Sequence, residues 1–491
     1  MIMKKSNVFL LLVLTVIFGL FLRLFFFTKV VSGDDLEYYN FAYQIIQHTF
    51  KHDASFHSPR IGLTYPTALF YNLFGINEIT SNLLPLLASA LSIILIFYLG
   101  KIMFNEKIGL TASFLLSFFP LNVFYSTTLF PDLSSAFFMA LSVYLFLKAD
   151  KNKSNLNYLL AGLCVGFGYL MKELSALILI FFVIYIIHKK SFKKAHLLVP
   201  LGFLMIFVFE LSYYAIKTSN PLFRYTIVSG QATNIMKAYY PNYFGINALS
   251  RLFLHYPYLV FTDTLTVFFY IFILIALIYC VARKKRETYT ILFWILPIAL
   301  YVNFGSLSFS QYVPLPAGVR YLEIITIPSI LLMSFFFYEN RNFLNKFFLP
   351  AILIFLFVTS IYFIATNEQR NSTENLYKAS SFMKTAPKRI IYTDPRSAEI
   401  LKYLFNFERN EFVESYNKYD ALEFNKDRNN LADLKNIHDA YVVVNWRMIN
   451  ALLTNYKGMK LPPEVKEIPK NWQEKFSYGK GNSRLIIYYV S

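Results

Sequence analysis

The segment Val8–Tyr39, VFLLLVLTVIFGLFLRLFFFTKVVSGDDLEYY, joins a long apolar run to a cluster of carboxylates. Its first part, Val8–Phe27, is long enough to cross a lipid bilayer as a helix. Asp34, Asp35 and Glu37 follow at the point where this helix leaves the membrane. Carboxylates beside a membrane are costly unless they are solvated, paired or bound, so they indicate a functional site. The structural alternative is that Asp34 caps a helix and Glu37 completes the cap.

The rest of the chain repeats the apolar pattern. Apolar runs of about 20 residues, the length of a membrane span, recur as far as Ala365, and 56% of the residues are hydrophobic. The two cysteines, Cys164 and Cys280, lie inside such runs and predict buried apolar packing without a disulfide. The sequence therefore predicts a mainly α, polytopic membrane protein with about eleven transmembrane helices.

The net charge of +18 is concentrated in six connectors between these runs. The basic connectors are Lys4 and Lys5, then residues 101–107, 148–153, 189–194, 283–286 and 341–346. Under the positive-inside rule they are all cytoplasmic. Of the 14 acids before Asn367, four lie in or directly beside these connectors, and the other ten lie on or toward the opposite face. This sorting indicates a membrane topology and argues against binding to nucleic acid.

The connectors also define domains. Residues 1–366 form the predicted transmembrane domain, with a long, structured first outer loop at residues 28–80 whose residues 35–49 have helical periodicity. After Asn367 the composition becomes that of a soluble protein. Strands are predicted at residues 389–393, 440–445 and 484–490, and helices near 374–385 and 397–407. With eleven helices and a cytoplasmic start, the α/β domain at residues 367–491 is expected to be extracytoplasmic.

Because successive helices cross the membrane in alternate directions, the count of helices also predicts which charged residues lie at the outer face. Asp132 starts a descending helix, Lys172 and Glu173 occupy an outer turn, and Arg320 precedes a late helix. The outer loop at residues 217–258 adds basic residues at positions 224, 237 and 251. Structural alternatives are a helix-dipole role for Asp132, a Lys172–Glu173 ion pair and an Arg320–Glu323 ion pair.

Acids, cations and aromatic rings on one face suit glycosyl transfer from a lipid phosphate. A carboxylate can accept the proton of an acceptor hydroxyl, and Arg or Lys can stabilise a departing phosphate. A transporter, or a lipid-handling protein without catalysis, is the alternative, because ionisable residues also mark substrate paths. Transporter sites lie near mid-bilayer, however, whereas these acids cluster in an outer loop.

Several motifs in residues 1–335 resemble those of the dolichyl-phosphate-mannose–protein mannosyltransferases, within the glycosyltransferase-C superfamily. They also resemble bacterial transferases that add aminoarabinose to lipid A. The matching motifs are Gly33-Asp34-Asp35-x-x-Tyr38, Arg60-x-Gly62 to Tyr65-Pro66, Tyr71-x-x-Phe74-Gly75, Pro131-Asp132, Gly162-x-x-x-Gly166 with Lys172, and Arg320-Tyr321 with Pro328.

The resemblance implies an inverting hexosyltransferase that moves mannose or a related hexose from a polyprenyl-phosphate donor to a protein, lipid or cell-wall acceptor outside the cytoplasm. The expected catalytic residues are Asp34, as general base, and Asp35. Expected substrate-binding residues are Arg60, Tyr65, Asp132, Lys172, Glu173, Arg320 and Tyr321. No metal site is predicted, although Asp34, Asp35 and Asp132 could hold a divalent cation.

Overall fold

The computed structural model describes residues 5–31, 33–230, 256–308, 312–315, 318–370, 372–416, 434–455 and 461–491. The chain forms two compact units. The membrane unit contains residues 1–28, 51–70 and 79–367, and the second unit contains residues 29–50, 71–78 and 368–491. Residues 29–50, which carry Asp34 and Asp35, are therefore grouped with residues 368–491, although the two segments are far apart in sequence.

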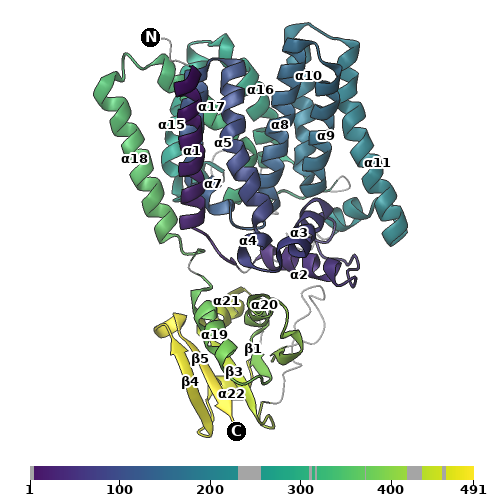
Figure 1. Cartoon of the computed structure of the whole chain (residues 1–491), viewed down its shortest axis with the longest axis vertical. Coiled ribbons are helices and arrows are strands. Elements are labelled where there is room, and N and C mark those ends of the chain that lie inside the picture. The colour runs from purple at the N-terminus through teal and green to yellow at the C-terminus, as the bar shows by residue number, and fades with distance from the viewer. Residues whose placement is uncertain are drawn as a thin grey trace. The chain divides into compact units, whose positions relative to one another are not determined.

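Apolar helices form the membrane unit, and each of the eleven expected runs is a helix (Figure 1). They are α1 (Lys5–Phe25), α5 (Leu83–Met103), α6 (Glu106–Ser117), α8 (Pro131–Asn152), α9 (Asn155–Met171), α10 (Ile178–Lys189), α11 (Leu198–Thr218), α15 (Val267–Ala282), α16 (Tyr289–Phe304), α17 (Glu323–Glu339) and α18 (Asn345–Thr366). Within the described residues, seven helices are long and apolar enough to cross a membrane. The prediction of a polytopic helical membrane protein is confirmed.

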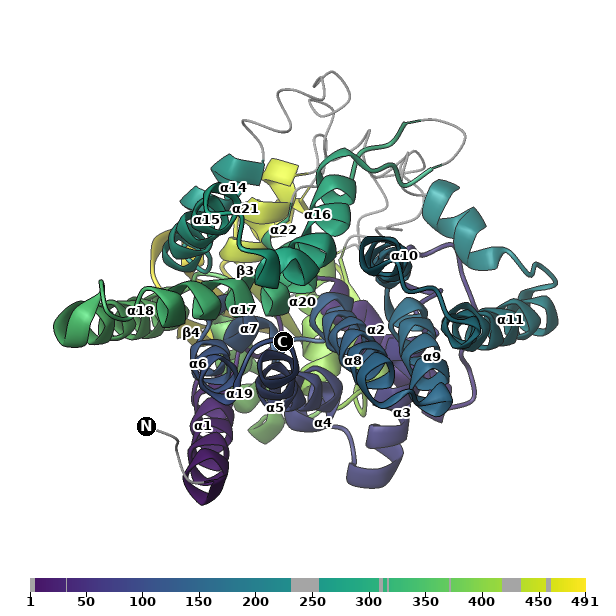
Figure 2. The ribbon, with the colours of Figure 1, turned by 90° about the horizontal axis from the view of Figure 1, so that it is seen from above.

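Helix α17 is the central helix of this unit. It packs against α6, α8, α15 and α16. Of the most apolar stretch of this helix, 83% is buried inside the protein, compared with 17% for α18, which lies at the periphery (Figure 2). Glycines allow the closest helix contact: a Cβ atom on Gly162 of α9 would lie 2.0 Å from the carbonyl oxygen of Val199 in α11. Small residues at such crossings let helix backbones approach closely, and this contact fixes the helix that ends beside Lys172.

Ion pairs join the basic connectors to the few acids found in them. Lys285, after α15, lies 2.6 Å from Glu339 at the end of α17. Lys193, before α11, pairs with Asp150 near the end of α8. These contacts gather the connectors at one end of the helices, as the charge pattern predicts, and the candidate site residues of this unit occupy the other end.

Short elements complete the chain outside the long helices. They are α2 (Asp34–Ile46), α3 (Ile61–Phe74), α4 (Glu78–Ser81), α7 (Pro120–Tyr125), α14 (Tyr256–Thr262) and the 3-10 turns η1 (Glu173–Leu177), η2 (Lys194–Leu197), η5 (Arg286–Thr288), η6 (Val319–Leu322), η7 (Asn410–Phe412) and η8 (Gly481–Ser483). Residues 28–80, the segment expected to be a structured outer loop, contain the helices α2, α3 and α4.

The C-terminal part of the second unit is built on a five-stranded mixed sheet of order β2-β1-β3-β5-β4. Its strands are β1 (Ile391–Thr393), β2 (Val413–Ser415), β3 (Ala440–Asn445), β4 (Trp472–Tyr478) and β5 (Leu485–Val490). Strand β1 runs parallel to β2 and β3, whereas β5 runs antiparallel to β3 and β4. The helices are α19 (Glu374–Thr385), α20 (Pro395–Leu404), α21 (Trp446–Asn455) and α22 (Pro463–Lys466).

The three predicted strands and two predicted helices of this domain are present. Strands β2 and β4 were not expected from the sequence, because β2 has only three residues and β4 exposes most of its side chains. Val442, Val444 and Ile486 form the centre of a buried cluster on one face of the sheet. Burial of that apolar face gives the domain a core of its own.

Candidate active site

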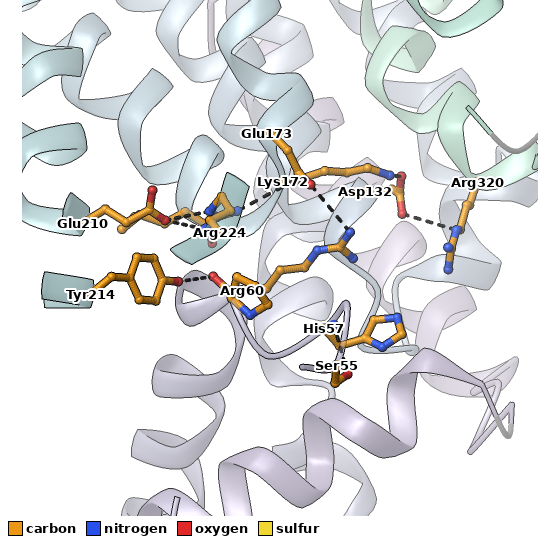
Figure 3. A network of polar contacts seen from close by, with 12 residues as sticks. Ser55, His57, Arg60, Asp132, Lys172, Glu173, Glu210, Tyr214, Arg224 and Arg320 are labelled. Atoms are coloured by element: carbon orange, nitrogen blue, oxygen red, sulfur yellow. Dashed lines mark hydrogen bonds and ion pairs between the residues drawn. The ribbon is translucent and has the colours of Figure 1, made fainter. Parts of the chain in front are cut away.

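A buried ion pair between Asp132 and Lys172 stands at the centre of the membrane unit's polar cluster (Figure 3). Asp132 is the second residue of α8, after Pro131, and Lys172 directly follows α9. The Lys172 ammonium donates a hydrogen bond to Oδ1 of Asp132 and lies 3.8 Å from the centre of the Tyr321 ring. The side chain of Lys172 is 5% exposed and that of Asp132 is 1% exposed, so each charge depends on the other for compensation.

Arg320 approaches the same carboxylate from the opposite side. Its Nε lies 3.9 Å from Oδ2 of Asp132, and its guanidinium lies over the rings of Phe130 and Tyr321. The Arg320 side chain remains 25% exposed, and Oδ2 of Asp132 is buried without a hydrogen-bond partner among the described residues. This geometry leaves one cation accessible and one carboxylate oxygen able to accept a hydrogen bond from a ligand.

A second set of charges surrounds Glu173. Its carboxylate oxygens lie 4.0 Å from an Arg60 nitrogen and 3.8 Å from an Arg224 nitrogen. Arg224 also contacts Glu210 at 2.6 Å and donates a hydrogen bond to the carbonyl oxygen of Leu170 at 2.9 Å. Burial would raise the pKa of the Glu173 carboxyl, but the Arg60 and Arg224 charges outweigh it and lower that pKa.

Both ion pairs that were considered as structural alternatives are replaced by other contacts. Lys172 pairs with Asp132 rather than with its neighbour Glu173. Glu323 accepts a hydrogen bond from Nδ2 of Asn122 at 3.2 Å, and Oδ1 of Asn122 accepts one from Arg23 at 2.7 Å. These partners come from other helices, and spacing along the chain does not reveal them.

Glu210 and Arg224 belong to this cluster, but the sequence pattern alone assigns neither of them a role in the site. The usable signal was a carboxylate within the apolar helix α11, because a charge in such a helix requires a partner. The two other basic positions of that loop, Lys237 and Arg251, lie outside the described residues.

Tyr65 belongs to a chain of polar side chains beside this cluster. Its hydroxyl lies 2.7 Å from that of Tyr213, which lies 2.9 Å from Nε2 of His52. Burial lowers the pKa of His52 to about 4, so the imidazole is neutral at neutral pH. Tyr65 itself is 39% exposed, so its ring is available to a ligand.

An apolar cavity of about 420 Å³ lies beside the cluster, between α14, α15, α16 and α17. Its lining includes Leu274, Leu296, Leu300 and Leu332, and also Tyr321. Tyr321 is therefore shared: its ring contacts the Lys172 ammonium and also lines the cavity. Cations and an apolar cavity with one common wall suit an amphiphile with an anionic head.

Asp34 and Asp35 belong to the second unit and differ from each other in environment. Asp35 is fully buried, and its carboxylate accepts hydrogen bonds from the backbone N–H groups of Val31, at 2.8 Å, and Gly33, at 2.7 Å. Burial raises the pKa of Asp35, and those two hydrogen bonds oppose the effect. Asp34 is only partly buried.

The capping interpretation of Asp34 is wrong. Helix α2 begins at Asp34, its N-cap residue is Gly33, and the cap makes no side-chain hydrogen bond. Asp34 is thus a residue of the first helical turn, where its negative charge still interacts favourably with the helix dipole.

A metal ion has no evident set of ligands. Within the described ranges, no group of three or more His, Cys, Asp or Glu side chains is arranged to hold one. The carboxylates considered for this role have other partners, since Asp132 pairs with Lys172 and Asp35 bonds to backbone N–H groups.

Comparison with known proteins identifies the class to which this fold belongs. The chain superimposes on the oligosaccharyltransferase of Archaeoglobus fulgidus in the apo form, with a TM-score of 0.59, 13% identity, and coverage of 98% of this chain and 75% of that one. It also superimposes on ArnT from Cupriavidus metallidurans, in the apo state and bound to undecaprenyl phosphate. Both comparisons give a TM-score of 0.59, 12% identity, and coverage of 99% and 98%. The fold is that of the glycosyltransferase-C membrane transferases.

A family model adds sequence evidence. Residues 57–214 match the model described as dolichyl-phosphate-mannose-protein mannosyltransferase. This range includes Arg60, Asp132, Lys172 and Glu173. No curated protein matches the chain at a significant level. The resemblance inferred from the sequence motifs is confirmed.

Proposed function

We propose that this protein transfers a sugar, mannose or a related hexose, from a polyprenyl-phosphate donor to an acceptor on the extracytoplasmic face of the cell membrane. The observation that carries the proposal is the position of Tyr321, whose ring contacts the Lys172 ammonium and lines the apolar cavity. A polyprenyl phosphate has the matching parts, an anionic head and an apolar chain.

Donor binding is assigned to the charged cluster of the membrane unit. Lys172 and Arg320 interact with the phosphate and stabilise the charge that develops as it leaves. Asp132 holds Lys172 in place. Its Oδ2 has no hydrogen-bond partner in the described part of the chain and is suited to accept a hydrogen bond from a sugar hydroxyl. Arg60, Glu173 and Tyr65 are assigned to the remaining substrate contacts.

Asp34 is assigned as the general base. In a single inverting displacement, the acceptor oxygen bonds to the anomeric carbon while the bond from that carbon to the phosphate oxygen breaks. The proton of the acceptor passes to the Asp34 carboxylate, and the bonding electrons leave with the polyprenyl phosphate. Asp35 supports this chemistry by ordering the backbone beside Asp34, because its oxygens bind the Val31 and Gly33 N–H groups.

Two of the structural relatives support the substrate class. One ArnT structure contains undecaprenyl phosphate, and one structure of the archaeal oligosaccharyltransferase holds a tethered acceptor peptide. A lipid-linked donor with a protein, lipid or cell-wall acceptor is consistent with both.

A transporter is the second candidate function. The observation that favours it is the buried row of hydrogen-bonded side chains Arg23, Asn122 and Glu323. Ionisable residues within a helical bundle mark substrate paths. The proposed phosphate ligands lie elsewhere: Lys172 follows α9, and Arg320 precedes α17.

The deciding experiment incubates purified full-length protein with radiolabelled polyprenyl-phosphate hexoses. We expect the sugar to be released or transferred, and the reaction to be lost in Lys172→Gln but kept in Lys189→Gln, an exposed lysine at the end of α10. Movement of the labelled donor across liposomes, with the sugar–phosphate bond intact, would instead establish the transporter.

Orientation is tested separately, by labelling single cysteines in a background without Cys164 and Cys280. His48→Cys and Lys480→Cys, both at exposed positions of the second unit, should react with an impermeant reagent on intact cells. Lys151→Cys, in a basic connector, should react only after the cells are opened. The reverse pattern would place the second unit in the cytoplasm.

A further inference from the structure

Both backbone polar groups of Val30 bind to side chains of the C-terminal domain. The hydroxyl of Thr373 donates a hydrogen bond to the Val30 carbonyl oxygen at 2.7 Å, and the Val30 N–H donates one to the Tyr377 hydroxyl at 3.3 Å. Val30 is 1% exposed and Thr373 is 1% exposed. Lys29, one residue earlier, has a left-handed backbone (φ 65°), and its ammonium lies over the Tyr377 ring. Residues 29 and 30 are therefore held by the start of α19.

Thr373 makes this bond in place of a more usual one. It is the N-cap residue of α19, where a threonine hydroxyl normally accepts a hydrogen bond from the helix backbone. Here its side chain makes no cap hydrogen bond and donates to Val30 instead. Removal of the hydroxyl would therefore free the Val30 carbonyl oxygen without removing a cap from α19.

The order imposed on Val30 continues to Asp34 through the backbone. Asp35 binds the N–H groups of Val31 and Gly33, and this interaction closes the loop against the first turn of α2. Asp34 lies within that turn. The proposed base is thus directly connected to a segment whose upstream end is fixed by Thr373 and Tyr377.

Two aromatic stacks hold the body of α2 downstream. The rings of Tyr39 and Tyr403 lie 4.6 Å apart at 17°, and those of Tyr43 and Phe407 lie 4.3 Å apart at 16°. Positions 39 and 43 are one turn apart on α2 and so share a face. Phe407 itself has a left-handed backbone (φ 62°), which the surrounding packing must compensate.

We propose that the C-terminal α/β domain positions the base-bearing segment, residues 29–46, and thereby sets the orientation of Asp34. Thr373, Tyr377, Tyr403 and Phe407 are positioning residues that fix the segment upstream and downstream of the base. The catalytic consequence rests on the proposed function, whereas the positioning itself does not.

The positioning is tested by hydrogen exchange on the full-length protein. In Thr373→Val, which keeps the side-chain shape, the amides of residues 31–37 should exchange faster than in the wild type, by about fivefold for the loss of one buried hydrogen bond. Amides of β3 and β5 should be unchanged. Thr385→Val is the matched control, because Thr385 is an exposed threonine of the same helix. Equal exchange at residues 31–37 in Thr373→Val and the wild type would overturn the proposal.

The catalytic effect is tested by turnover of radiolabelled polyprenyl-phosphate hexose. Thr373→Val should lower kcat between about 5-fold and 100-fold, the range for a displaced catalytic group, with donor KM kept within about twofold. Tyr43→Phe keeps the ring and should be near normal, whereas Tyr43→Ala should lose kcat. Normal kcat in both Thr373→Val and Tyr43→Ala would overturn the catalytic role of the domain.

Coupling distinguishes positioning from general damage to the fold. Tyr43→Ala and Phe407→Leu remove the two sides of one stack, so the double variant should lose no more kcat than the worse single variant. Additive losses would show that the stack does not act as a unit and would contradict the proposal. If the wild type releases no sugar while the exchange result holds, the proposed function fails and the positioning survives.

Discussion

Lys172 donates a hydrogen bond to Asp132 across 40 residues of sequence, from the end of one membrane helix to the start of another. Both side chains are almost completely buried, yet Arg320 stands on the far side of the same carboxylate with a quarter of its side chain exposed. The carboxylate thus orients two cations of different accessibility. Such an arrangement can receive a phosphate at the exposed cation while the buried one keeps its charge and position.

Replacement of Lys172 by Gln should abolish donor binding and destabilise the protein. It leaves Asp132 buried without its partner, a loss that typically costs about 3–5 kcal/mol. Glu173→Gln should weaken donor binding much less, because Glu173 contacts Arg60 and Arg224 rather than Lys172. Binding of undecaprenyl phosphate to each purified variant checks this order. Equal loss in both variants would show that Lys172 has no special relation to the phosphate.

Arg320→Lys keeps the positive charge but removes the planar guanidinium that lies over Phe130 and Tyr321. Because a lysine cannot form a bidentate contact with a phosphate, we expect turnover to fall by about tenfold, with the fold intact. The measurement is steady-state sugar transfer, with thermal unfolding as the control for stability. Turnover equal to the wild type would remove Arg320 from the phosphate site.

Asp34→Asn should fold and bind the donor, yet transfer sugar at least about 100-fold more slowly, as expected for loss of a general base. The amide has the size of the carboxylate but cannot take the acceptor proton. No cap is lost, since Gly33 is the N-cap residue and makes no side-chain bond. Single-turnover transfer from a labelled donor gives the rate, and a near-normal rate in a well-folded variant would end this assignment.

Arg224→Met should lower the thermal stability of the protein strongly. It leaves Glu210 buried in α11 without its partner, and an unpaired buried charge typically costs about 3–5 kcal/mol. The double variant Glu210→Gln with Arg224→Met removes both charges, so it should recover much of the loss. A double variant less stable than Arg224→Met would show that the two residues act independently.

Asp394 should give the C-terminal domain a pH-dependent stability. Burial raises the pKa of this carboxyl to about 6, so the folded domain holds the proton more tightly than the unfolded chain. Its stabilising contribution is complete below the unfolded pKa of about 4 and is lost as the pH rises through about 6, a change of roughly 3 kcal/mol. Asp394→Asn, which keeps the helix cap, should lack this change. Hydrogen exchange of α20 and β3 amides between pH 4 and 8 measures it; the same slope in wild type and variant would exclude Asp394 as the cause.

The sequence by itself determined the helical framework. Apolar runs have one low-energy state in a bilayer, because a helix satisfies its own backbone hydrogen bonds, so helices such as α5 (Leu83–Met103) and α16 (Tyr289–Phe304) were predictable as elements from the sequence. The distribution of Lys and Arg among the connectors predicted which helix ends lie together. The acidic and basic motifs predicted candidate site residues, because a charged side chain near a membrane is costly unless it is paired or has a function.

Only the tertiary structure decided which of these charges are partners. Lys172 pairs with Asp132 instead of its neighbour Glu173, and Arg224 pairs with Glu210 and Glu173, partners that its basic loop did not reveal. Helix packing brings these side chains together. That packing depends on contacts such as the one between Gly162 and Val199, which the hydrophobic periodicity of the sequence does not reveal. The same holds for Asp35, whose oxygens accept hydrogen bonds from backbone N–H groups. The sequence shows only that an aspartate is present, whereas its chemical role depends on the hydrogen-bond donors that the fold places beside it.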